Sequence, residues 1–260
     1  MRASQTSAPG RSEALFEQLL RIGDNALILG HRLSEWVGHA PALEEELATA
    51  NVALDLIGQA RNWLAYAGEV EGRGRDEDAL AFHRDVLDFH NVLLVEQPNG
   101  HYGDTIARQF LFDAFHFLQL EALAAGRDAR IAELAAKSVK EVGYHLRRSG
   151  EWVVRLGDGT ELSHERIQHA IDDAWIFVDE LFTADAVDRA VQEAGVGPDP
   201  ASLRPPWEAR VQAVLTEAGL ERPREGPVRT GGKQGTHSEH LGYLLAEMQF
   251  LPRAYPDARW

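Results

Sequence analysis

Three stretches of the sequence carry acidic, amide and histidine side chains three to seven residues apart among apolar ones. Because an α-helix turns once in 3.6 residues, such spacings would place each set along one face of a helix. Carboxylates and histidines that project into a bundle of long helices can hold two metal ions and so support oxygen chemistry. The residues concerned are Asn51, Asp55 and Asn62, then Gln109, Asp113 and His116, and finally Glu141 and His145.

The spacing of these residues does not complete a two-metal centre. Ferritin-like carboxylate proteins use a Glu from each of two helices and a Glu-x-x-His pair from each of two others. Asp113 and His116 have this spacing within an apolar helix, whereas the pair at 161 and 164 straddles a predicted turn. Gly58 stands where a His should follow Asp55, and Val142 stands where a Glu should precede His145. The sequence therefore predicts no catalytic residue and no metal site.

We interpret the polar positions as a degenerate site in which buried charges are paired with one another, because an unpaired buried charge is costly. Lys140 is the expected cation, so Lys140→Met should destabilise the chain, and adding Asp55→Asn and Asp113→Asn should recover much of the loss. The predicted degenerate site comprises Glu35, Asp55, Asp113, His116, Lys140, Glu141 and His145.

One alternative stays open. The acidic and histidine side chains of this set could instead make the chain a metal-binding oxygenase or ferroxidase in its own right. The residues available to that activity are Asp55, Asp113, Glu141, His116 and His145.

The elements that must position these residues are helices. Five long segments show helical periodicity and none shows sustained strand alternation, which predicts an all-α fold. The connector at 76–103 has the length that a ferritin-like helical bundle needs between its second and third helices. The long helices are expected at about 12–39, 44–67, 104–126, 128–156 and 163–182, with shorter ones at 207–218 and 237–251.

The predicted domain organisation has three parts. Residues 1–11 are small and polar and predict a disordered tail. Residues 12–183 are expected to form the ferritin-like bundle. Residues 184–260, punctuated by four prolines between 198 and 206, are expected to form a C-terminal helical extension packed on the bundle.

Composition excludes several function classes. The 260 residues include 41 acidic and 26 basic side chains, and the formal charge of −15 argues against nucleic acid as a partner. The absence of cysteine excludes disulfides, cysteine–zinc sites and thiol nucleophiles, and is compatible with a reducing cytoplasm. No apolar run approaches the roughly 20 residues that cross a membrane.

Two C-terminal motifs invite a binding interpretation. His237, Glu239 and His240 resemble a metal cluster, but they open a predicted helix after a Gly-rich loop, which favours capping and interface contacts. The loop at 231–235 lacks the spacing of a phosphate-binding P-loop. Arg229 beside this loop and Lys233 within it remain candidates for contact with the phosphates of coenzyme A.

Five stretches of this chain, at 33–41, 51–62, 94–100, 140–147 and 229–249, occur in the order found in a known family. They resemble the C-subunit family of the bacterial phenylacetyl-CoA epoxidases. The likeness extends from about residue 20 to residue 260.

The resemblance implies a component of a multicomponent monooxygenase that uses O2 and NADPH to epoxidise phenylacetyl-CoA in aerobic phenylacetate catabolism. It implies that the catalytic A subunit carries the di-iron centre. The C subunit would share its ferritin-like fold without the metal ligands and bind it in a stable complex. A small coupling subunit and a flavin and iron–sulfur reductase would complete the system.

We therefore expect a non-catalytic structural subunit in the cytoplasm, with no cofactor of its own. It should form a hetero-oligomer with the catalytic A subunit that buries more than about 2,000 Å², and the same face could support self-association. Large aromatic side chains are frequent interface anchors, so Trp36 and Trp63 in the first helices are the expected contacts.

Overall fold

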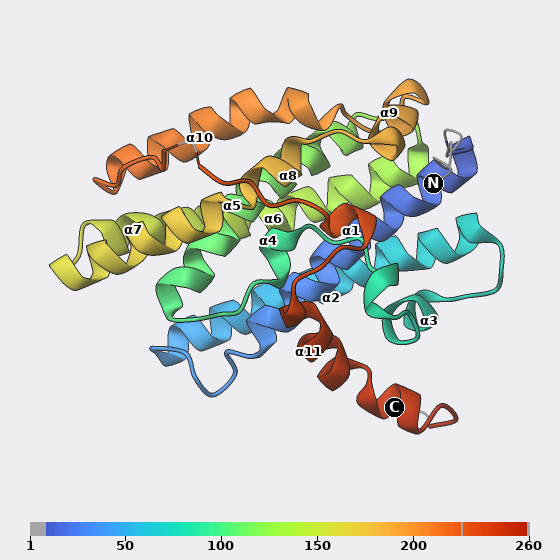
Figure 1. Ribbon diagram of the computed structural model, residues 1–260, viewed down its shortest axis with the longest axis horizontal. Coiled ribbons are helices and arrows are strands. Elements are labelled where there is room, and N and C mark those ends of the chain that lie inside the picture. Colours follow the sequence, from blue (N-terminus) through green and yellow to red (C-terminus); the bar gives the residue numbers. More distant parts are fainter. Residues whose placement is uncertain (1–8, 225, 259–260) are drawn as a thin grey trace, which may run out of the picture.

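The structure is a computed structural model that describes residues 9–224 and 226–258, and in these residues it contains helices and turns but no β-strand. The predicted all-α fold class is confirmed (Figure 1). The predicted disordered tail falls mostly outside the described residues, and the first helix begins at Arg11. No helix in the described ranges is long and apolar enough to cross a membrane.

Four long helices form a ferritin-like bundle of two antiparallel pairs. In the first pair α1 packs along α2, and in the second α5 packs along α6 (Figure 1). A further helix, α7, packs against both members of the second pair. The helices are α1 (Arg11–Ser34), α2 (Leu43–Glu71), α5 (Tyr102–Ala124), α6 (Ala129–Gly157) and α7 (Glu161–Trp175).

The connector between the two pairs covers α1. It contains α3 (Glu77–Phe82), the 3-10 turn η1 (Val86–Asp88) and α4 (Leu93–Glu96). With α2 and the connector on α1, every residue of that helix from 18 to 30 is buried. Its polar side chains must therefore find partners inside the protein.

Two polar residues of α1 fix the connector in place. The carboxylate of Asp24 accepts hydrogen bonds from the guanidinium of Arg84, at 3.0 Å from Nη1, and from the backbone N–H of His90, at 2.9 Å. One residue later, Asn25 Oδ1 accepts from the backbone N–H of Val92 at 2.8 Å. These contacts hold the connector along α1 and so help to set where α5 begins.

The C-terminal residues form short helices on the outside of the bundle. Helix α9 packs on α1, and α10 packs on α5 and α6. Beyond α10 the chain returns across the molecule as a loop and ends in two helices that project from the body (Figure 1). These elements are α8 (Val178–Phe182), α9 (Ala186–Glu193), η2 (Pro200–Leu203), α10 (Arg204–Glu217), η3 (Gly232–Gln234), α11 (Glu239–Met248) and α12 (Phe250–Ala254).

Helix boundaries differ from the prediction at four places: α2 continues to Glu71, the predicted helix 237–251 is divided into α11 and α12, and the other two differences concern α1 and α7. Helix α1 ends at Ser34 and not near His39, because the following residues turn and Gly38 adopts a φ of +81°. The predicted helix 163–182 is divided into α7 and α8. At the break, the carbonyl of Ile176 accepts from the backbone N–H of Arg229 at 2.8 Å, so a loop contact takes the place of a helical one.

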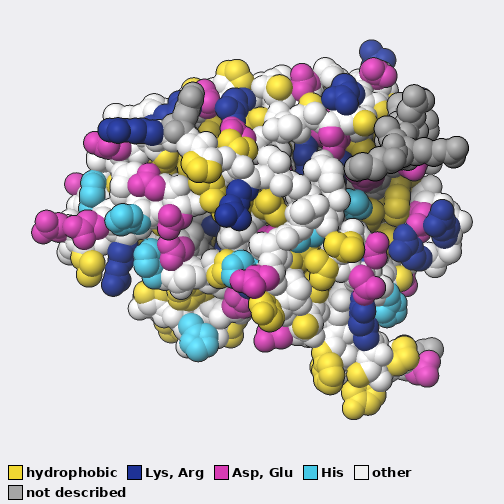
Figure 2. All heavy atoms as spheres, viewed as in Figure 1, with side chains coloured by type: hydrophobic (Ala, Val, Ile, Leu, Met, Phe, Trp, Pro, Cys, Tyr) yellow, Lys and Arg dark blue, Asp and Glu magenta, His cyan; other side chains and the backbone are white. Residues whose placement is uncertain are grey.

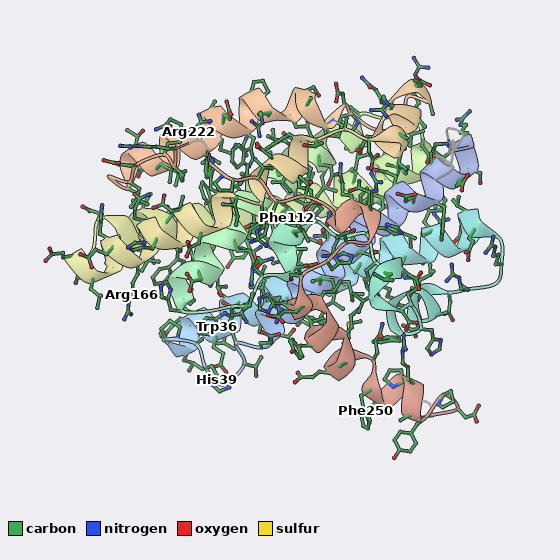
Figure 3. All side chains as sticks on the ribbon, in the orientation of Figure 1. Trp36, His39, Phe112, Arg166, Arg222 and Phe250 are labelled. Atoms are coloured by element: carbon green, nitrogen blue, oxygen red, sulfur yellow. The ribbon has the colours of Figure 1, made fainter. Side chains whose placement is uncertain are left out.

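Among the exposed apolar side chains, two groups stand together. One lies on the projecting C-terminal helices, where hydrophobic atoms are visible in Figure 2 and Phe250 is labelled in Figure 3. It comprises Tyr243, Phe250, Leu251 and Tyr255. The other lies on α2 and comprises Leu43, Leu47 and Leu54, which are 69%, 59% and 65% exposed. We call this second group the α2 leucine stripe.

Candidate functional site

Polar side chains from α2, α5 and α6 meet in the middle of the bundle, in the region where the sequence predicts the remains of a metal site. Their spacing along each helix, at three or four residues, turns them toward the same space. We call this set the central polar cluster. Its members are Asp55 and Gln59 of α2, Gln109, Asp113 and His116 of α5, and Glu141, His145 and Ser149 of α6.

Asp113 is the most deeply placed carboxyl of the cluster, with 1% of its surface exposed. It accepts hydrogen bonds from Gln109 Nε2 at 2.7 Å and from Ser149 Oγ at 2.8 Å. Burial disfavours its ionised form and raises its pKa to about 6, although nearby His145 and the two donors oppose this. The partners of Asp113 are thus neutral groups, and no cation forms an ion pair with it among the described residues.

A second part of the cluster is a chain of hydrogen bonds through an amide. Gln59 Nε2 donates to Glu141 Oε2 at 2.9 Å, and Gln59 Oε1 lies 3.1 Å from His116 Nε2. Burial lowers the pKa of His116 to about 4, so the ring is neutral at pH 7 and must carry its proton on Nε2 to donate to the amide oxygen. The ring also stacks on Phe112, with centroids 5.3 Å apart.

The third part joins α6 to α2. His145 has a fully buried side chain, and its Nε2 donates to Asp55 Oδ2 at 3.0 Å, while the Asp55 side chain is 38% exposed. The other ring nitrogen, Nδ1, is buried and has no hydrogen-bond partner among the described residues. Nearby, Arg148 of α6 donates to Glu45 at 2.7 Å and so links α6 to the start of α2 beside the cluster.

This donor set does not suit a pair of metal ions. Hard divalent metals at such centres need several ionised carboxylates that converge on one point. Here Gln59, Gln109 and Ser149 instead occupy the coordination space and donate to the carboxylate oxygens. In the described residues no three His, Cys, Asp or Glu side chains are placed together so that they could hold a metal ion.

Two residues of the predicted degenerate site lie elsewhere. Glu35 caps the end of α1, has a side chain that is 40% exposed, and pairs with Arg32 at 2.8 Å. Lys140 is exposed on the outer face of α6. The prediction that Lys140 neutralises the buried carboxylates is wrong, because it stands five residues before His145, which is roughly 140° around the helix.

The other cations that could pair with these carboxylates are occupied or exposed. Arg61 and Lys137 lie at the surface, and Arg108, although buried, donates to the carbonyl of Gln97 and to Asn99 Oδ1.

Sequence reasoning missed two members of the cluster, Gln59 and Ser149. Each stands four residues after a recognised member, Asp55 and His145 respectively. Residues four apart on a helix share a face, and this spacing is the signal by which both could have been found.

The two C-terminal motifs are anchored inside the protein. The ring nitrogens of His237 hydrogen-bond Glu96 Oε2 at 2.7 Å and Phe89 O at 2.8 Å, and Ser238 is the residue before α11, so the motif makes internal contacts at the start of that helix. Lys233 Nζ donates to Asp188 Oδ2 at 2.8 Å and to Thr183 O at 2.6 Å.

The Gly-rich loop that carries Lys233 is held by a buried carboxylate. Glu180, which is 1% exposed, accepts from the backbone N–H of Leu93 at 2.7 Å and of Gly231 at 2.8 Å. Because its ammonium is engaged within the protein, Lys233 does not point to a phosphate as the sequence suggested. Arg229 is exposed.

Comparison with known proteins gives the family. The family model described as phenylacetic acid catabolic protein matches residues 1–260. The chain belongs to this family. One relative, the C subunit of the 1,2-phenylacetyl-CoA epoxidase of Escherichia coli strain K12, is 54% identical over 241 residues, which are 93% of this chain and 97% of that protein. The resemblance drawn from the five stretches is confirmed.

The raised pKa of Asp113 predicts a pH-dependent stability of this chain. Below about pH 4 this carboxyl is protonated in the folded and the unfolded chain, and between about pH 4 and 6 it ionises only when the chain unfolds. Rising pH therefore removes stability, by about 2–3 kcal/mol in total once pH exceeds the folded pKa. Asp113→Asn should abolish this contribution.

The measurement is urea unfolding of both proteins at several pH values from about 4 to about 7.5. The stability of Asp113→Asn relative to the native chain should rise over this range, whereas the exposed Asp173→Asn should track the native chain throughout. Parallel curves for Asp113→Asn and the native chain would mean that Asp113 ionises freely in the folded state.

Proposed function

We propose that this chain is a non-catalytic structural subunit of a multicomponent phenylacetyl-CoA epoxidase, and that it binds the di-iron catalytic subunit. The observation that carries the proposal is the central polar cluster. Neutral donors from Gln59, Gln109 and Ser149 satisfy carboxylate oxygens that a metal centre would need as ligands. The chain is 54% identical to a protein named as the C subunit of such an epoxidase, and this identity supports the same proposal.

The α2 leucine stripe supports the assignment of a protein partner. The three leucines, at positions 43, 47 and 54, are spaced four and seven residues apart and so lie on one face of α2. Such leucines give a long helix one exposed apolar face, and a second bundle can pack side by side against that face.

The aromatic residues expected as interface anchors are engaged within the chain. Trp63 is 0% exposed, and Trp36 donates its Nε1 to Thr105 Oγ1 at 2.9 Å. The sequence-based choice of these two residues as free anchors is therefore replaced by the leucines of α2.

A second candidate function is metal-dependent oxygenase or ferroxidase activity of this chain. The observation in its favour is the buried Nδ1 of His145, which has no partner among the described residues and is a nitrogen of the kind that binds iron. The residues available to this function are Asp55, Asp113, Glu141, His116 and His145.

Metal analysis separates the two functions. The chain, purified alone from iron-rich medium without chelators, should contain less than about 0.2 iron per chain, because a real carboxylate site retains metal in stoichiometric amounts. About two irons per chain, lost in Asp113→Ala but kept in the surface variant Asp173→Ala, would establish the oxygenase function. Phenylacetyl-CoA epoxidation should require the added catalytic subunit if the structural role is correct.

A further inference from the structure

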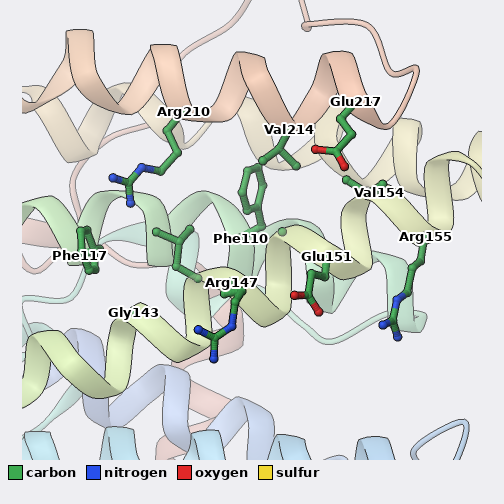
Figure 4. A pocket seen from close by; sticks show the side chains of 12 residues that line it. Phe110, Phe117, Gly143, Arg147, Glu151, Val154, Arg155, Arg210, Val214 and Glu217 are labelled. Atoms are coloured by element: carbon green, nitrogen blue, oxygen red, sulfur yellow. The ribbon is translucent and has the colours of Figure 1, made fainter.

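A hollow of about 540 Å³ lies between α6 and α10 on the side of α6 that faces away from the central polar cluster (Figure 4). Its floor is formed by α5. The volume falls within the range of small-molecule sites in proteins, about 300–1,000 Å³. Nothing in the proposed structural role uses this space.

The floor is aromatic, and glycines keep it open. Phe110 and Phe117 of α5 stand seven residues apart, and so do Gly150 and Gly143 of α6 opposite them. A Cβ at Gly150 would lie 3.6 Å from Phe110, and a Cβ at Gly143 would lie 3.4 Å from Phe117, so no side chain of α6 lies between these glycines and the rings; Phe110 is fully buried and Phe117 is half-buried. Glycine inside a helix costs about 1 kcal/mol relative to alanine. Helix α6 bears this cost twice on one face.

The rim of the hollow is cationic. Arg147 and Arg155 come from α6 and Arg210 comes from α10 (Figure 4). None of the three has a carboxylate within 4.0 Å in the part of the chain that the structure describes. Glu151 and Glu217 also line the hollow, so its formal charge is +1, on a chain whose net charge is −15.

Aromatic faces hold all three guanidinium groups in place of carboxylates. The guanidinium carbon of Arg210 lies 4.8 Å from the centroid of Phe117, that of Arg155 lies 5.4 Å from the centroid of Trp152, and that of Arg147 lies 5.7 Å from the centroid of Tyr144. Such contacts orient an arginine without neutralising it. The charge therefore remains available to an anion that enters the hollow.

We infer that this hollow is a binding site for a small amphipathic anion, with an aryl or alkyl body against Phe117 and Val214 and a carboxylate or sulfonate at Arg210 and Arg147. A bidentate contact from a guanidinium to such a head group is among the stronger polar contacts that proteins make. An apolar helix of a partner protein fits less well, since it would cover the guanidinium groups and leave them unpaired. Binding in this hollow does not depend on the proposed epoxidase role.

The test compares two fluorescent probes of the same shape. 8-Anilinonaphthalene-1-sulfonate carries the anionic head, and N-phenyl-1-naphthylamine is its uncharged counterpart. The full chain should bind one equivalent of the sulfonate at least about 10-fold more tightly than the neutral probe, as expected for one charge-assisted contact. Decanoate should displace the sulfonate and decanol should not.

Variants then locate the site. Arg210→Met should weaken binding of the sulfonate about 10-fold and leave the neutral probe unchanged. Gly150→Leu should fill the hollow and abolish binding of both, and the matched control Arg73→Met, at an arginine whose side chain is 80% exposed, should change neither. Far-UV circular dichroism establishes that each variant is folded; if Gly150→Leu is not, Val214→Trp fills the hollow from α10 instead.

Equal affinity for the two probes, or a sulfonate affinity that Arg210→Met does not change, overturns the inference. A second result would also overturn it. If sedimentation shows that the chain dimerises at high concentration, and binding of the sulfonate falls as the dimer forms, the occupant of the hollow is a second copy of the chain.

Discussion

Replacing Lys233 by methionine is expected to destabilise the folded chain by about 3–5 kcal/mol, the cost of breaking a buried ion pair from one side. Lys233 is 7% exposed, and its ammonium donates to Asp188, which is 6% exposed. The variant would leave that carboxylate with a single long ion pair, to Arg21 at 3.4 Å, because Arg21 is already bonded to Asp185 at 2.7 Å. Urea unfolding of the isolated chain at pH 7 measures the loss.

Lys140→Met is the matched control, because it makes the same change at an exposed lysine. Its stability should lie within the range expected of a surface substitution, about 0.5 kcal/mol from the native value. If the two variants unfold alike, the C-terminal loop does not depend on the pair between Lys233 and Asp188.

Placing two charges on the α2 leucine stripe, as Leu47→Asp with Leu54→Asp, should weaken the complex with the catalytic subunit at least about 100-fold. Both side chains are more than half exposed in the isolated chain, so the substitutions should leave its folding intact. At an interface of the obligate size the two carboxylates would be buried without partners, and each such burial costs several kcal/mol. The tagged catalytic subunit should therefore no longer retain the variant on a column.

Leu162→Asp is the control for this experiment. Leu162 is 55% exposed on α7, and its replacement should not change retention by the catalytic subunit. If the catalytic subunit retained the stripe variant and failed to retain Leu162→Asp, the interface would lie at the α7 end of the bundle and not on α2.

The sequence alone determined the helices and their order. Helical periodicity is a local signal, and so is a capping residue such as Asp128 at the start of α6, because both depend on residues within one or two turns. Asp128 Oδ1 accepts from the backbone N–H of Arg130 and Ile131, as a cap should. Helix geometry by itself also separates Lys140 from the face of His145, although both lie on the same helix and within one turn and a half of each other.

The partners of the polar side chains were decided only by the tertiary structure. Gln59 reaches Glu141 and His116 from positions 82 and 57 residues away, and Lys233 reaches Asp188 across 45. Periodicity gives the face on which a side chain lies, but the rotation and spacing of each helix against its neighbours determine which faces meet. The packing of the whole core sets this rotation and spacing. Only when the positions of the helices are known can one recognise the amide that satisfies a buried carboxylate, or the lysine that neutralises one.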